Sequence, residues 1–196
     1  MRPFRSYMRI GGLAVFGGAY TLASSACGTN PFAIDWQSSP DTAIVYSLSL
    51  PELNLPTAYD LVFVRQVMIQ NAGATGTWDF ALDNRGNGLA LLPPGVFGIT
   101  STAQITSLGS GLRFEDVTRA PTDTTLYVSD EPVMMELGNV YALRTHRRAG
   151  AGPFSETCFF YAKLEPLVID VENGILTFVF DRNPFCSDPD LVPKDN

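Results

Sequence analysis

The sequence predicts an all-β protein: a single antiparallel β-sandwich, or flattened barrel, of about eight to ten strands after an N-terminal signal segment. Three observations predict this fold. Short apolar stretches recur at roughly 8–12-residue spacing and are separated by Gly, Pro, Asn and Asp. Asn173-Gly174 stands between two β-rich runs, which is a strong hairpin signal. No amphipathic helical pattern follows the signal segment, so a βαβ arrangement is disfavoured.

Residues 1–26 have the features of a secretory signal peptide. Arg2, Arg5 and Arg9 form a basic start, and an uncharged run from Ile10 to Ala26 ends in small residues. As a helix this run would span roughly 25 Å, which is shorter than a ~30 Å hydrocarbon core. We expect the segment to be cleaved; a retained short anchor is the alternative.

Cys27 follows the small residues directly. Ser24-Ser25-Ala26-Cys27 resembles a bacterial lipobox, in which the cysteine becomes the acylated first residue, although Ser24 replaces the usual aliphatic residue. Two or more acyl chains would give a stable membrane anchor where one chain would not. Ordinary cleavage after Ala26 remains the alternative. We expect 27–32 to be a lipidated tether and 33–196 to be the β-sandwich domain.

The remaining cysteines form an even pair, as expected in an oxidising compartment. A bridge between Cys158 and Cys186 would close a loop of about 29 residues and stabilise the domain by roughly 3–4 kcal/mol in the chain-entropy treatment. Two free buried thiols are the competing interpretation. The chain has no C-x-x-C spacing, so neither a redox motif nor a zinc site is indicated.

The charge balance argues against one class of partner. Loss of the three N-terminal arginines leaves ten Lys and Arg against 20 Asp and Glu, a net charge near −10. Nucleic-acid binding needs clustered cations, so we expect no nucleic-acid partner.

The expected strands are short and bounded by turn residues. Pro51 and Pro56 bracket one turn, 83–88 forms a tight loop, and Pro93-Pro94-Gly95 ends the strand that follows it. Residues 114–117 fit either a strand or one helical turn, and the polar C-terminal tail is expected to be solvated. About eight to ten strands are expected, and the candidate segments are 34–36, 43–50, 61–69, 75–82, 89–92, 103–106, 124–128, 133–137, 140–145, 157–164, 167–171 and 175–180.

The chain is poorly equipped for common catalytic sites. His146 is the single histidine, there is no G-x-S-x-G elbow, and neighbouring arginines would oppose protonation of His146. We therefore expect His146 to be a solvated loop residue. The 83–88 loop resembles a calcium loop, but Arg85 occupies a ligand position. We expect no metal, no cofactor and no enzymatic activity.

Two surface features are candidates for partner binding. Arg144, His146, Arg147 and Arg148 form a cationic cluster on an acidic domain, and can pair with acidic headgroups or carboxylates. The second feature is a pair of apolar loop tips, at Phe97 and Phe154. The alternatives are a merely exposed hairpin end and loop tips that fold back over the sandwich.

The chain resembles uncharacterised small bacterial lipoproteins with a β-sandwich domain. The resemblance rests on Ser24-Ser25-Ala26-Cys27 and on the stretch from Tyr141 to Pro166, and it implies export and anchoring on the periplasmic side of a bacterial membrane. We therefore expect a non-catalytic module that docks on a membrane or envelope protein, such as an extrinsic subunit of a membrane complex.

Two other functions stay open. The first is a sandwich that binds a glycan or small ligand, which would need Trp36 or Trp78 exposed on a concave face. The second is a hydrolase built on two carboxylates drawn from Asp79, Glu115, Asp116 and Glu165.

Overall fold

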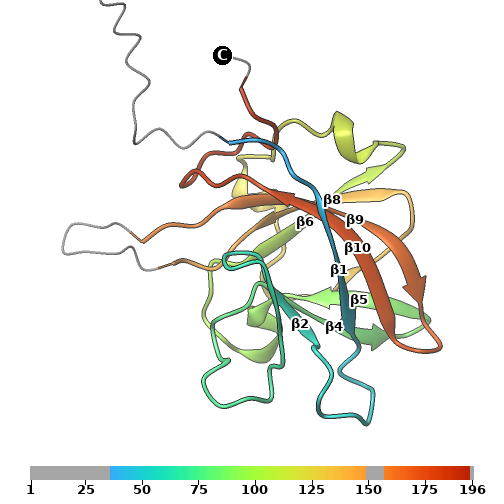
Figure 1. The fold of residues 1–196 in the computed structure, drawn as a ribbon. Coiled ribbons are helices and arrows are strands. Elements are labelled where there is room, and N and C mark those ends of the chain that lie inside the picture. Colours follow the sequence, from blue (N-terminus) through green and yellow to red (C-terminus); the bar gives the residue numbers. More distant parts are fainter. Residues whose placement is uncertain (1–35, 149–156, 195–196) are drawn as a thin grey trace, which may run out of the picture. The chain divides into compact units, whose positions relative to one another are not determined.

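The computed structural model describes residues 36–148 and 157–194 (Figure 1). The predicted signal segment (1–26), Cys27, the tether (27–32) and Phe154 lie outside the described residues. None of the helices in the described part is long and apolar enough to cross a membrane.

Ten strands form two five-stranded sheets, so the predicted all-β sandwich is confirmed (Figure 1). All pairs of named strands are antiparallel. The first sheet consists, in spatial order, of β1 (Asp41–Tyr46), β10 (Ile175–Arg182), β9 (Tyr161–Asp170), β8 (Asn139–Arg144) and β6 (Gln104–Ser110). The second sheet consists of β3 (Arg65–Val67), β2 (Ala58–Asp60), β4 (Phe80–Arg85), β5 (Gly88–Leu92) and β7 (Val133–Met134). Three short 3₁₀ helices lie between strands: η1 (Pro94–Phe97), η2 (Phe114–Asp116) and η3 (Thr124–Leu126).

The main core lies between the two sheets and is rich in aromatic side chains. Tyr59 and Phe80 from the second sheet meet Phe178 and Phe180 from the first, with ring centroids 5.2–5.7 Å apart. Edge-to-face pairs of this kind add stability beyond the burial of their area. Successive residues of a strand point to opposite faces, so the alternating apolar positions of the sequence supply this core.

Both sheets are also covered on their outer faces. Val140 and Ala142 of β8 pack under Tyr127 and the C-terminal Leu191. Ala81 and Leu92 of the second sheet pack under Trp78. Central strands are therefore buried on both sides, which explains why several of them read as continuous apolar runs.

The two hairpins predicted from turn residues are confirmed. Gly174 has φ 63° in the turn between β9 and β10, where the pairing of Ile175 with Asp170 closes the hairpin. Pairing of Arg85 with Gly88 closes the hairpin between β4 and β5. Only a glycine adopts positive φ at low cost, which is why Gly174 marks the turn.

Several expectations about local structure are wrong. The expected strand 75–82 exists only from Phe80, where β4 starts. The run 61–69 is not one strand: residues 61–64 form a turn, and β3 starts at Arg65. Residues 124–126 form η3, because the Asp123 side chain accepts the backbone N–H of Thr125. The C-terminal tail is packed on the domain, with Leu191 1% exposed and its N–H donated to the Thr118 carbonyl at 2.8 Å.

Candidate functional site

A buried aspartate–histidine pair connects the two sheets. Asp79 lies directly before β4, His146 lies two residues after β8, and their exposed fractions are 1% and 7%. Asp79 Oδ1 accepts the backbone N–H of His146 at 2.6 Å and lies 2.9 Å from Nδ1 of its ring. Asp79 Oδ2 accepts the backbone N–H of Leu61 at 2.6 Å. One carboxylate therefore joins β4, the segment after β8 and the turn after β2.

A second buried carboxylate, Asp60, shapes that turn. Asp60 Oδ1 accepts the backbone N–H groups of Val62 and Phe63 at 3.0 and 3.1 Å, and Oδ2 accepts Arg65 Nε at 2.9 Å. These bonds fold the chain back immediately after β2, in the way that aspartate side chains initiate turns. Val64 closes the turn with φ 53°, an unusual value for a β-branched residue.

The environment shifts both members of the Asp79–His146 pair. Burial raises the pKa of the Asp79 carboxyl, and its N–H partners oppose that rise. Burial disfavours a charged His146 ring, but the hydrogen bond and charge of Asp79, with a smaller contribution from Asp60, raise the pKa of His146. Because Oδ1 of Asp79 is an acceptor, we assign a proton to Nδ1 of His146 in both protonation states.

Asp60, Asp79 and His146 have the residue types of a metal site, but their hydrogen bonds do not fit one. One ligand atom from each residue lies within 4.8 Å of the others, and all three residues are buried. However, every carboxylate oxygen of Asp60 and Asp79 already accepts an N–H. Asp79 Oδ1 accepts two N–H groups, from the backbone and the ring of His146, so a cation at this oxygen would displace a donor and leave a buried N–H unpaired, at about 1–3 kcal/mol. The three residues are therefore best described as a hydrogen-bonded cluster that fixes the local fold.

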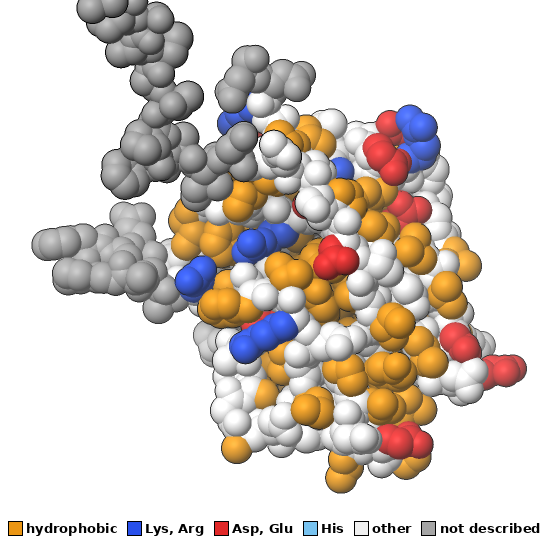
Figure 2. All heavy atoms as spheres, in the orientation of Figure 1, with side chains coloured by type: hydrophobic (Ala, Val, Ile, Leu, Met, Phe, Trp, Pro, Cys, Tyr) orange, Lys and Arg blue, Asp and Glu red, His pale blue; other side chains and the backbone are white. Residues whose placement is uncertain are grey.

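Above this cluster, arginines surround an exposed aromatic ring. We call Phe63, Arg65, Arg147, Arg148 and Arg182 the arginine surface. Phe63 is 51% exposed, and the guanidinium carbons of Arg65 and Arg148 lie 5.2 and 5.0 Å from its ring centroid. Arg182 donates to the Val62 carbonyl at 2.9 Å, which places it at the same turn. In Figure 2, Lys and Arg side chains gather beside hydrophobic ones on one side of this face, whereas most acidic side chains lie on the other side.

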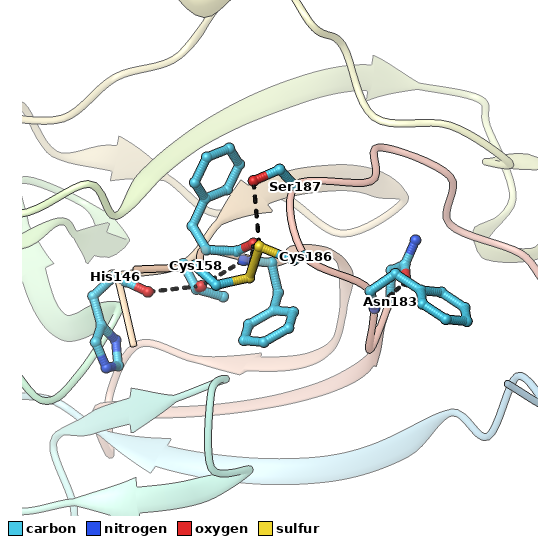
Figure 3. The surroundings of a disulfide bond; sticks show 9 residues. His146, Cys158, Asn183, Cys186 and Ser187 are labelled. Carbon is cyan, nitrogen blue, oxygen red and sulfur yellow. Dashed lines mark hydrogen bonds between the residues drawn. A yellow bond between two sulfur atoms is a disulfide. The ribbon is translucent and has the colours of Figure 1, made fainter. Parts of the chain in front are cut away.

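The predicted cysteine pair lies near His146 (Figure 3), and Cys158 pairs with Arg148 of the arginine surface. Cys158 and Cys186 are disulfide-bonded, which confirms the predicted pairing. Cys158 and Arg148 exchange two backbone hydrogen bonds, of 2.7 and 2.9 Å. The Thr145 hydroxyl donates to the His146 carbonyl and accepts the Phe160 N–H, both at 2.9 Å. Backbone bonds and the disulfide thus fix the segment that carries Arg147 and Arg148.

The residues predicted for partner binding do not all lie together. Arg147 and Arg148 are both exposed, as expected, and Arg148 lies over the Phe63 ring. Arg144 is half-buried: it donates to Gln104 Oε1 at 2.8 Å, and its guanidinium carbon lies 4.3 Å from the Phe159 ring. The expectation that His146 is a solvated loop residue is wrong, because Asp79 draws it into the interior.

The remaining predicted residue, Phe97, is 42% exposed and lies edge-on to Trp78, with ring centroids 5.7 Å apart. It covers an outer face of the second sheet and does not extend away from the domain. This is the alternative arrangement, in which the loop tip folds back over the sandwich.

The roles of Asp60, Phe63, Arg65 and Arg182 were not predicted from the sequence. One signal was present for the turn: an aspartate before an apolar run can cap two or three following N–H groups.

Comparison with known proteins found no matching protein family, no matching curated protein and no matching solved structure.

Proposed function

We propose that this chain is an exported, lipid-anchored β domain that docks without catalysis on an acidic region of a membrane or envelope protein. The observation that carries the proposal is the arginine surface: an exposed Phe63 ring flanked by two guanidinium groups, on a domain with net negative charge. Arginine and aromatic side chains are enriched among the residues that dominate binding energy. Guanidinium groups also bind carboxylates and phosphates with directional hydrogen bonds.

The charge distribution supports docking in one orientation. The acidic domain repels an acidic partner over most of its surface, whereas the cationic surface attracts it. The lipid anchor on Cys27 is part of the proposal, and it would hold the domain close to membrane proteins. A disulfide between Cys158 and Cys186 is typical of exported proteins, so it supports this location.

A hydrolase receives little support by comparison. Asp60 and Asp79 lie close together, but both are buried, and their oxygens are occupied by N–H donors. A glycosidase needs two carboxyl groups that flank an accessible substrate.

Affinity isolation of the tagged full chain from membranes solubilised in mild detergent tests the docking proposal. We expect the wild type to retain a membrane-protein partner that is released by raised salt, because exposed charge pairs are screened. The double variant Arg65→Ala/Arg148→Ala should lose this partner. The matched control is Arg113→Ala, since Arg113 is also an exposed arginine, paired with Asp116.

Two results would contradict the proposal. If the wild type, the double variant and the Arg113→Ala control recover the partner equally, the arginine surface is not the docking site. If the chain is recovered only as a free monomer, it does not dock on a partner. Mass spectrometry of the mature N-terminus tests the anchor separately: an acylated Cys27 is expected, and a mature chain that starts elsewhere without acyl mass would refute lipidation.

A further inference from the structure

A pocket of about 400 Å³ lies next to the arginine surface, between the segment before β1 and the end of β10. Its apolar lining includes Trp36, Pro40, Val64 and Phe180. This volume is near the lower end of the roughly 300–1,000 Å³ that is usual for small-molecule sites. The pocket is therefore large enough for one or two small rings.

Two contacts hold the wall that carries Trp36. The Ser38 hydroxyl donates to the Asp181 carboxylate of β10, and the Trp36 ring meets Phe185 edge-on at 6.3 Å. Trp36 is half-buried and still lines the pocket. A wall that is fixed before binding loses little conformational entropy on binding.

The two tryptophans have different roles. Trp78 is 2% exposed and lies beneath Phe97, so its faces are closed to any ligand. Trp36 is the tryptophan that can stack on a ligand ring.

The charges in the lining restrict the ligand chemistry. Asp41 and Asp181 would repel an anion, and Arg182 partly offsets the attraction of these carboxylates for a cation. A wholly apolar ligand would take Asp41 and Arg182 out of water without hydrogen bonds, which is costly. This mixture of carboxylates, a guanidinium group and an aromatic ring suits a neutral ring with apolar C–H faces and many hydroxyl groups.

We propose that this pocket binds a neutral sugar residue of a glycan. The ring stacks on Trp36, and its hydroxyls hydrogen-bond with Asp41, Gln37 and Arg182. Carboxylate, amide and guanidinium groups together supply both the acceptors and the donors that sugar hydroxyls need. The site shares Arg182 with the arginine surface but includes neither Phe63, Arg65 nor Arg148, so the two proposals can be tested separately.

A glycan microarray that carries neutral, sialylated and sulfated oligosaccharides tests the proposal with the purified mature protein. Calorimetry on the best-bound oligosaccharide then compares variants. We expect binding to neutral glycans, weakened at least about 10-fold by Trp36→Ala and largely kept by Trp36→Phe. Asp41→Asn should also weaken binding, because it removes the charge that strengthens the bond to a sugar hydroxyl.

The controls separate this site from the arginine surface. Leu53→Ala alters an exposed residue outside the pocket lining and should change nothing. Arg148→Ala should leave neutral glycan binding intact even if it abolishes partner docking. Unchanged thermal unfolding of each variant shows that the fold is preserved. The proposal would be overturned if no neutral glycan on the array were bound, or if Trp36→Ala left the affinity unchanged. It would also be overturned if only acidic glycans were bound and Arg148→Ala abolished that binding, which would assign recognition to the arginine surface.

Discussion

Replacing Asp79 with alanine should destabilise the domain more than any exposed substitution. The Asp79 carboxylate accepts three N–H groups: from the Leu61 backbone, the His146 backbone and the His146 ring. Asp79→Ala leaves these three donors without their acceptor, at about 1–3 kcal/mol for each one that stays buried. Removing one member of a buried charged pair typically costs about 3–5 kcal/mol, and we expect a loss within that range.

Urea unfolding followed by tryptophan fluorescence measures this loss, because the buried Trp78 reports on the core. The matched control is Asp116→Ala, which removes an aspartate from an ion pair with Arg113 at the surface. Exposed pairs contribute about 0–1 kcal/mol, so the control should stay close to wild type. If Asp79→Ala costs no more than Asp116→Ala, the assignment of Asp79 as the connection between the sheets is wrong.

Three further predictions follow from the same contacts. Asp79 raises the pKa of His146 in the folded protein above its ordinary value of 6.5. The protonated ring therefore stabilises the folded state fully below pH 6.5, and this contribution is lost as the pH rises through the higher folded pKa. Urea unfolding from about pH 6 to about pH 9 should show the decline in the free energy of unfolding, and His146→Gln should remove this pH dependence. Cys158→Ser/Cys186→Ser should lower stability by about 3 kcal/mol, and reductant should reproduce the loss in wild type but not in the variant. Gly174→Ala should cost about 1–3 kcal/mol in thermal unfolding, because φ is 63° and the added Cβ would lie 2.9 Å from Ser47 Cβ; an unchanged Tm would contradict the register of this hairpin.

The features that were predictable from the sequence depend on short-range patterns or on simple counting. Asn173-Gly174 specifies a turn by its backbone preference alone, and the pairing of Cys158 with Cys186 follows from counting the cysteines other than Cys27. The sandwich class follows from the spacing of apolar runs. None of these predictions requires knowing which distant residues meet.

The candidate site was not predictable, because its members meet only through the topology. Asp79 and His146 are 67 positions apart, and their contact requires β4 and β8 to lie in facing sheets. In the sequence, His146 stands beside Arg147 and Arg148, so the local pattern indicated a solvated residue in a cationic segment. The fold buries His146, whose backbone N–H and ring both bind Asp79, while it exposes Arg147 and Arg148, which follow it.

The buried cluster and the arginine surface are mechanically connected. The Leu61 N–H that binds Asp79 opens the turn that carries Phe63 and Arg65, and the His146 N–H directly precedes Arg147 and Arg148. The two sides of the arginine surface come from opposite sheets, and Asp79 bonds to both segments. Preorganised side chains lose less entropy on binding, so this buried carboxylate sets the spacing of the guanidinium groups for the docking that we propose. Substitution of Asp79 should therefore weaken the proposed docking at this surface even under conditions in which the domain stays folded.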